Sequence, residues 1–230
     1  MEKPVIGLGI PLSWPYIHSD TFYSLMTMAK PGECHMIHAS SGPIDQMRNL
    51  IVRKALEINC THVLFLDADM TYPVDTIPRL LESGKEVVGA LCFKRWPPFT
   101  PTLFCGEPEK LWQLDEYPEG LVKVTATGTG CLLVDCKVFE EMDYPWFAFD
   151  HTQDGGPIGE DVNFCYKAGR LGYAVFVDTR IKTGHLTMMR ATEGWWRLME
   201  NIKKAGKGRV DYKGSGSAEW APQLIEDNAT

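Results

Sequence analysis

Hydrophobic positions in the first part of the chain switch between short continuous runs and helical spacing. Residues 5–10 and 61–66 are largely apolar runs of strand length, which are typical of strands buried on both faces of a parallel sheet. Between them, apolar residues recur at steps of three and four and form one face of a predicted helix: Ile44, Met47, Ile51, Ala55 and Ile58. This alternation predicts βαβ units, and hence an α/β fold with a mainly parallel central sheet flanked by helices.

The pattern changes in the middle of the chain. Residues 96–117 are rich in proline and aromatic side chains and show no helical period, so we expect a loop with short hairpin strands there. Strand patterns return at 121–127, 128–134 and 173–177, and a helical pattern returns at 160–171. The middle segment therefore predicts a small antiparallel hairpin insertion within the α/β domain.

The chain is expected to form a single domain followed by a tail. Residues 1–205 carry all of these patterns, and we expect them to fold as one Rossmann-like domain. Residues 206–230 are rich in glycine, serine and lysine near their start, which predicts a flexible C-terminal tail.

Composition narrows the functional classes. Thirty acidic and 23 basic residues give a net charge of −7, which disfavours a nucleic-acid binder because such proteins need a basic surface. Apolar runs fall short of the ~18 residues of a membrane span, and the start lacks a signal-peptide pattern. The seven cysteines form no CxxC pair. We therefore expect free thiols in a reducing compartment, with a cytoplasmic location.

The strongest chemical signal is Asp67-Ala68-Asp69, which directly follows the apolar run 61–66. In an extended backbone, residues two apart point the same way, and ligands of open α/β sheets bind at the carboxyl ends of the strands. Two carboxylates in one crevice favour a Mn²⁺ or Mg²⁺ ion, whose remaining positions take diphosphate oxygens and water. A polar strand end that caps the next helix is the structural alternative.

Three further segments carry candidate chemistry. Glu160 and Asp161 begin a predicted helix, where a carboxylate either accepts a proton from an attacking hydroxyl or simply caps the helix. The helix dipole is expected to favour the ionised form of Asp161. Residues 128–130 (Gly-Thr-Gly) either admit a ligand close to the backbone or bend a strand. His185 follows the last predicted strand, and a lone histidine is more often structural than a ligand.

The order of these segments resembles a metal-dependent nucleotide-sugar glycosyltransferase of the GT-A fold, similar in style to the family 2 enzymes. The resemblance runs from about Val5 to His185 and is carried by FLDADM (65–70), GTGCLLVDCKVFEEM (128–142), GEDVNFCYKAGRLGY (159–173) and the pair Arg48-Asn49. Family 2 enzymes commonly have an Asp after the second strand that reads the nucleobase. Here residues 38–40 are His-Ala-Ser, so the resemblance implies no particular donor base.

The resemblance implies a role for each matching residue. Asp69 would bind the divalent metal directly, Asp67 would contact the donor ribose or the metal's water, and His185 would be a late third ligand. Asp161 would be the general base and Glu160 would contact the acceptor. The remaining implied contacts fall into two groups: Pro11, Arg48 and Ala68 at the nucleotide, and Gly128, Thr129 and Gly130 at the acceptor.

The leading hypothesis is therefore transfer of a sugar from a nucleoside-diphosphate sugar to an acceptor hydroxyl on a glycan, lipid or other molecule. We expect inversion at the sugar carbon, because a candidate base is present. A sugar nucleotidyltransferase is the second hypothesis, although residues 7–13 contain no Lys or Arg to bind a triphosphate. A non-catalytic carbohydrate- or nucleotide-binding relative is the third, and the two acidic pairs favour activity over it.

Overall fold

The computed structural model describes residues 3–107, 110–204, 209–211 and 223–225. The chain divides into two units, Met1–Leu186 and Thr187–Thr230. The second unit contains α6 (Glu193–Lys204) and an antiparallel pair of short strands, β15 (Arg209–Asp211) and β16 (Gln223–Ile225). Most of the predicted tail, 206–230, lies outside the described residues.

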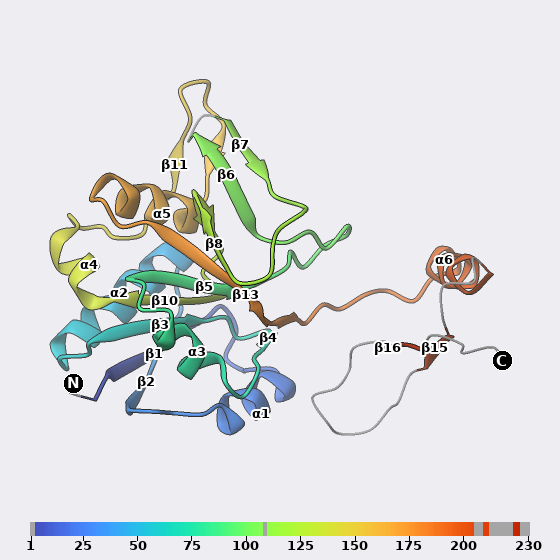
Figure 1. Cartoon of the computed structure of the whole chain (residues 1–230), viewed down its shortest axis with the longest axis horizontal. Coiled ribbons are helices and arrows are strands. Elements are labelled where there is room, and N and C mark those ends of the chain that lie inside the picture. Colours follow the sequence, from blue (N-terminus) through green and yellow to red (C-terminus); the bar gives the residue numbers. More distant parts are fainter. Residues whose placement is uncertain (1–2, 108–109, 205–208, 212–222, 226–230) are drawn as a thin grey trace. The chain divides into compact units, whose positions relative to one another are not determined.

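The first unit alternates strands and helices as the sequence predicts (Figure 1). Its first half runs β1 (Val5–Leu12), α1 (Ser19–Thr27), β2 (Glu33–Ser40), α2 (Ile44–Glu57), β3 (His62–Leu66), β4 (Met70–Thr71), α3 (Thr76–Glu82), β5 (Val87–Leu91). Its second half runs β6 (Leu103–Glu107), β7 (Lys110–Gln113), β8 (Leu121–Val124), β9 (Ala126–Thr127), β10 (Cys131–Asp135), α4 (Cys136–Glu141), β11 (Asp150–His151), β12 (Pro157–Ile158), α5 (Glu160–Arg170), β13 (Val175–Lys182), β14 (Gly184–His185).

Within the described residues, seven strands form the central sheet in the order β2-β1-β3-β10-β5-β13-β8. The pairs β1–β2, β1–β3 and β5–β13 are parallel, whereas β10 runs antiparallel to both β3 and β5, and β8 runs antiparallel to β13. Five strands therefore point one way, and the sheet is mostly parallel. Because β10 is reversed, its first residues meet the carboxyl end of β3.

Helices cover both faces of this sheet, and each face has its own apolar core. Along β3, Val63 and Phe65 join the core under α2, α4 and α5, while Leu64 and Leu66 join the core under α1 and α3. The alternation follows from the period of two along a strand. All four side chains are fully buried, as expected for a strand covered on both faces. The carboxyl end of β3 is thereby held between two packed layers of helices.

The hairpin insertion is confirmed. Strands β7, β6 and β9 form a small antiparallel sheet beside the main one, and a turn over residues 92–102 leads into it from β5. That turn is closed by backbone bonds from Lys94 N–H to Thr100 O (2.8 Å) and from Thr102 N–H to Cys92 O (2.9 Å). The sequence pattern does not predict the two-stranded antiparallel ribbon of β11 and β12, which precedes α5.

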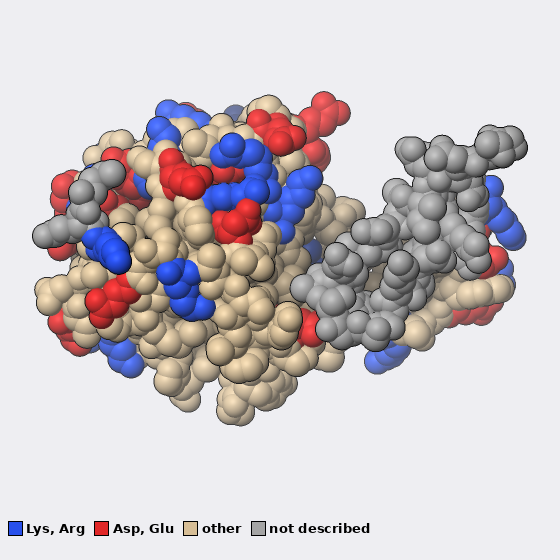
Figure 2. Space-filling view, turned by 60° about the horizontal axis from the view of Figure 1, so that its bottom comes forward, with Lys and Arg blue, Asp and Glu red and all other residues tan. Residues whose placement is uncertain are grey.

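The distribution of charged residues and the state of the cysteines agree with what the composition predicts. Lys and Arg lie among Asp and Glu on the face shown in Figure 2, so no broad basic surface is visible there. All seven cysteines are free thiols, and Cys60, Cys92, Cys131, Cys136 and Cys165 are buried. In the part of the chain that the structure describes, no helix has the length and apolar content needed to cross a membrane.

Candidate active site

Segments that are far apart in the sequence meet at one edge of the sheet. Asp67 follows β3, and its N–H donates to Gly130 O (3.1 Å) at the start of the reversed strand β10. The carboxyl end of β5 lies at the same edge and leads to Arg95, while β13 leads to His185 in β14, which pairs with β4. The arrangement places all of these residues at the edge where open α/β sheets bind ligands.

Two adjoining cavities open at this edge. The larger, about 450 Å³, is lined by the following residues: Arg48, Asp67, Met70, Cys92, Phe93, Lys94, Arg95, Trp96, Pro97, Pro98, Thr100, Thr102, Gly128, Thr129, Gly130, Asp161 and His185. The smaller, about 320 Å³, is lined by Pro11, Ser13, Trp14, Ile44, Arg48, Asp67, Asp69 and Arg95. Arg48, Asp67 and Arg95 line both cavities, so they stand along the boundary where the cavities meet. We call the two cavities together the crevice, and its two ends are the Arg48 end and the Arg95 end of this boundary.

A buried arginine closes one end of the crevice. Arg48 lies on α2, its side chain is 6% exposed, and its Nη2 lies 3.4 Å from Asp67 Oδ1. Its Nη1 contacts Oε1 of Glu160, which is itself buried at the start of α5. The guanidinium therefore ties α2 to both the end of β3 and the start of α5. Arg48 and Glu160 are both buried, so each of these two charges depends on the other, whereas Asp67 keeps some contact with solvent at 27% exposure.

The other end of the crevice holds Asp69. Its Oδ2 contacts Arg95 Nη2 and lies 3.5 Å from His185 Nε2. His185 is fixed from behind, because its Nδ1 donates to the carbonyl of Phe93 at 2.8 Å. Burial pushes the pKa of Asp69 upward, but the neighbouring side chains of His185 and then Arg95 hold it below its usual range. Asp69 is therefore a carboxylate facing a cation and an imidazole nitrogen.

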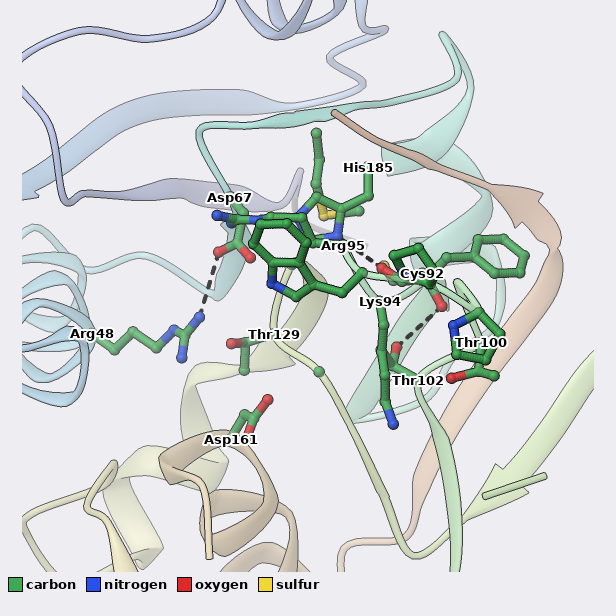
Figure 3. A pocket seen from close by; sticks show the side chains of 17 residues that line it. Arg48, Asp67, Cys92, Lys94, Arg95, Thr100, Thr102, Thr129, Asp161 and His185 are labelled. Atoms are coloured by element: carbon green, nitrogen blue, oxygen red, sulfur yellow. Dashed lines mark hydrogen bonds and ion pairs between the residues drawn. The ribbon is translucent and has the colours of Figure 1, made fainter. Parts of the chain in front are cut away.

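The wall of the larger cavity carries Asp161. Figure 3 shows Asp67, Thr129 and Asp161 following one another along this wall, with Arg48 reaching in from the side. Thr129 Oγ1 is buried and has no hydrogen-bond partner among the described residues. A buried hydroxyl without a partner costs free energy, so Thr129 is placed to bond a group that enters the cavity.

The pKa of Asp161 shifts in the direction opposite to the sequence prediction. The helix start favours its ionised form, but burial raises its pKa, and the charge of Asp67 adds to the rise while Arg48 opposes it. Burial likewise raises the pKa of Glu160, again against the charge of Arg48. A carboxylate with a raised pKa holds an accepted proton more firmly, which improves it as a base.

Glycines keep the crevice open. A Cβ on Gly130 would lie 2.5 Å from Met70 Sδ and 3.1 Å from Asp67 Oδ2. A Cβ on Gly128 would lie 3.7 Å from Asp161 Oδ2, in ordinary contact. Gly130 is thus required by the close packing of β10 against the end of β3, whereas Gly128 leaves space beside Asp161.

The structure brings most of the predicted site residues together. Those that line the crevice are Pro11, Arg48, Asp67, Asp69, Gly128, Thr129, Gly130, Asp161 and His185. Glu160 lies behind Arg48 instead of in the cavity wall, and Ala68 packs against the core under α1. The sequence does not predict Arg95 as a site residue, because no local pattern connects it with Asp69. The signal available was its place in a Lys-Arg-Trp run that follows a predicted strand.

Asp69 and His185 are suited to a divalent cation, whereas Asp67 is turned to Arg48. A carboxylate oxygen and an imidazole nitrogen are ligands that Mn²⁺ accepts, and diphosphate oxygens and water would complete its coordination. Among the described residues, no three His, Cys, Asp or Glu side chains gather closely enough to hold a metal by themselves. A metal held by Asp69 and His185 would therefore need its remaining ligands from water or from a bound molecule.

No protein-family model matches the chain, and no curated protein matches it. Among solved structures, it is similar to A197 from STIV, with a TM-score of 0.55 and 15% identity over 80% of this chain and 85% of that one. It is also similar to S. aureus TarS 1–349 in complex with UDP-GlcNAc, with a TM-score of 0.52 and 15% identity over 87% of this chain. The match spans 66% of that TarS chain. These likenesses show a mixed α/β fold of the Rossmann-like type.

Proposed function

We propose that the protein transfers a sugar from a nucleoside-diphosphate sugar to an acceptor hydroxyl, with a divalent metal and with inversion at the sugar carbon. The observation that carries the proposal is the meeting of Asp67, Asp69, Asp161 and His185 around two joined cavities. The bound UDP-GlcNAc of the TarS structure makes a uridine diphosphate sugar the first donor to test.

The smaller cavity suits the nucleotide part of such a donor. Trp14 offers an exposed aromatic face there, stacked at 6.3 Å on Tyr16, and a base can stack on an aromatic ring. Asp67 and Asp69 line the same cavity. The metal, held by Asp69 and His185, would offset the negative charge that develops on the departing diphosphate.

Asp161 is positioned for the chemical step in the larger cavity. Its carboxylate takes the proton from the acceptor hydroxyl while the acceptor oxygen bonds to the sugar carbon. The bond from that carbon to the diphosphate breaks at the same time, and its electron pair leaves with the diphosphate. The raised pKa of Asp161 favours this proton transfer.

Arg48 and Glu160 act as positioning residues in this scheme. Because Arg48 contacts both Asp67 and Glu160, it fixes the end of β3 relative to the start of α5, where Asp161 lies. Thr129 Oγ1, which has no partner within the described part of the chain, faces the space between Asp67 and Asp161 (Figure 3). We assign it a hydrogen bond to a hydroxyl of the donor sugar or the acceptor.

Asp161→Asn tests the function directly. General-base catalysis contributes ~10²–10⁴-fold, so we expect turnover of UDP-sugars to fall by about that factor, with UDP binding retained. The assay follows metal-dependent release of UDP from a panel of UDP-sugars, with and without acceptors, and titration calorimetry measures UDP binding. Turnover within a few-fold of the wild-type rate would remove Asp161 from the mechanism.

Asp135→Asn is the matched control. Asp135 is the N-cap residue of α4, and its carboxylate accepts a hydrogen bond from Lys137 N–H at 3.0 Å. Asp161 lies in the first turn of α5, and its carboxylate likewise accepts a hydrogen bond from a backbone N–H, that of Val162, at 2.8 Å. Asp135 lies at the opposite end of β10 from the crevice. We expect this variant to lose stability by about 1 kcal/mol or less and to keep its turnover. A fall in turnover equal to that of Asp161→Asn would indicate a general effect of helix starts.

A further inference from the structure

Arg95 occupies the atoms that a divalent metal would use. Its Nη2 contacts Asp69 Oδ2, and its Nε donates to His185 Nε2 at 3.4 Å. The imidazole is turned so that Nδ1 donates to Phe93 O, which leaves Nε2 facing Asp69 and Arg95. One guanidinium therefore contacts both of the side chains that the proposed function assigns to the metal, and the same atoms cannot hold both cations at once.

The side chain of Arg95 is free to leave while its backbone stays fixed. The turn that carries it is closed by Lys94 N–H to Thr100 O and by Thr102 N–H to Cys92 O. By contrast, the Arg95 side chain is 46% exposed and Asp69 is 31% exposed. Ion pairs with this much solvent contact are weak and are readily exchanged. Departure thus requires rotation of one side chain, without movement of the loop.

Arg95 also stands at the place where a diphosphate must lie. It lines both cavities, and the diphosphate of a nucleotide sugar joins the nucleoside to the sugar. A guanidinium binds phosphate oxygens with paired hydrogen bonds. Once the Arg95 guanidinium is displaced from Asp69, it still lies within reach of the diphosphate that binds together with the metal.

We infer that Arg95 is an exchangeable counter-ion: it holds the cation position between Asp69 and His185 in the free protein and moves to the donor diphosphate when the metal takes its place. The inference rests on the proposed function, because it assumes a nucleoside-diphosphate ligand. It makes metal binding depend on the nucleotide, since the metal must displace Arg95 and the diphosphate gives Arg95 a new partner. Arg95 is thereby a positioning residue for the donor, beyond the acidic residues that the sequence indicated.

The experiment measures two affinities on Arg95→Ala. Mn²⁺ binding to the nucleotide-free protein is followed by electron paramagnetic resonance, and we expect it to strengthen about two- to fivefold because the competing ion pair is gone. UDP binding at saturating Mn²⁺ is followed by calorimetry, and we expect it to weaken about tenfold or more because a charged hydrogen-bond donor is lost. Opposite changes in the two affinities are the signature of the exchange.

Lys94→Ala is the matched control, and Arg95→Gln is a second variant. Lys94 carries the same charge on the same turn, but its ammonium lies over the Phe104 ring at 5.5 Å. Lys94 also lines the larger cavity, so we expect its loss to change Mn²⁺ affinity by less than the loss of Arg95 does, whereas Arg95→Gln should reproduce the result of Arg95→Ala. Melting temperatures of all variants establish that they are folded.

Three outcomes would overturn the inference: unchanged Mn²⁺ affinity in Arg95→Ala, an equal gain in Lys94→Ala, or UDP affinity unaffected by loss of Arg95. Failure of the proposed function looks different. In that case the wild-type protein itself neither binds UDP with Mn²⁺ nor releases UDP from any UDP-sugar, whatever residue stands at position 95.

Discussion

At each end of the crevice, one carboxylate of Asp67-Ala68-Asp69 contacts one arginine. The two arginines differ in how far they are exposed to solvent. At the closed end, Arg48 is 6% exposed and contacts both Asp67 and Glu160. At the open end, Arg95 is 46% exposed and contacts Asp69 beside His185. The two aspartates are almost equally exposed, at 27% and 31%, so the difference lies in the arginines. Arg48 is buried and also pairs with the buried Glu160, whereas Arg95 is half-exposed.

The difference in burial determines what each pair can do. A buried ion pair is costly to break, because the group left behind keeps its charge without solvent. A half-exposed pair is screened by water, so that either partner can find another ion. We infer that the closed end keeps the crevice in shape, while the open end changes partners during binding.

The largest expected effect is the loss of stability in Arg48→Ala. Removing one partner of a buried ion pair typically costs about 3–5 kcal/mol, and Glu160 would be left buried at the start of α5. Urea unfolding followed by circular dichroism measures the free energy of unfolding. A loss below about 1 kcal/mol would show that the two ends do not differ in the way their burial indicates.

A double variant sharpens this result. Replacing a buried ion pair with apolar residues of similar volume is often neutral or stabilising, so Arg48→Met with Glu160→Met should recover much of the stability lost in Arg48→Ala. Recovery would identify the uncompensated carboxylate as the cause. Further loss would instead assign the effect to packing of the Arg48 side chain against α5.

The sequence predicts the fold and the acidic residues better than it predicts their partners. The apolar run 61–66 defines β3, and Asp67 and Asp69 follow from their place after it. The reversed direction of β10 was not visible, because a short apolar strand has the same pattern in either direction. That reversal is what brings Gly128, Thr129 and Gly130 to the carboxyl end of β3.

The pairing of charges was beyond the reach of local patterns. Arg48 and Glu160 are 112 positions apart, and Arg95 reaches Asp69 from a proline-rich turn. Neither spacing is helical or strand-like, so only the folded topology brings these side chains together. Burial also decides the pKa of Asp161 against the effect of its helix start, and burial depends on every element around the crevice.

A smaller effect is expected from Gly130→Ala, which tests the fixed wall between the two ends. The added Cβ would lie 2.5 Å from Met70 Sδ and 3.1 Å from Asp67 Oδ2, and overpacking of this kind costs about 1–3 kcal/mol. Thermal and urea unfolding measure the loss. The control is Gly169→Ala on α5, where a Cβ meets nothing within 4 Å; there we expect a gain of up to about 1 kcal/mol. Equal changes in the free energy of unfolding at Gly130 and Gly169 would contradict close packing around Gly130.

The smallest expected effect is on the stability of Arg95→Ala in the absence of ligand. Because Arg95 is half-exposed and its turn is closed by backbone hydrogen bonds, we expect the free energy of unfolding to change by no more than about 0.5 kcal/mol. The measurement is the same urea titration used for Arg48→Ala, made with and without Mn²⁺ and UDP. Without ligands, the variant and the wild-type protein should unfold at about the same urea concentration. With both ligands present the wild-type protein should gain more stability than the variant, because stabilisation by a ligand rises with the logarithm of the ratio of ligand concentration to Kd, and the wild-type protein has the lower Kd for UDP. A loss of 2 kcal/mol or more in the free protein would mean that Arg95 supports the fold as Arg48 does, and that the open end is as fixed as the closed one.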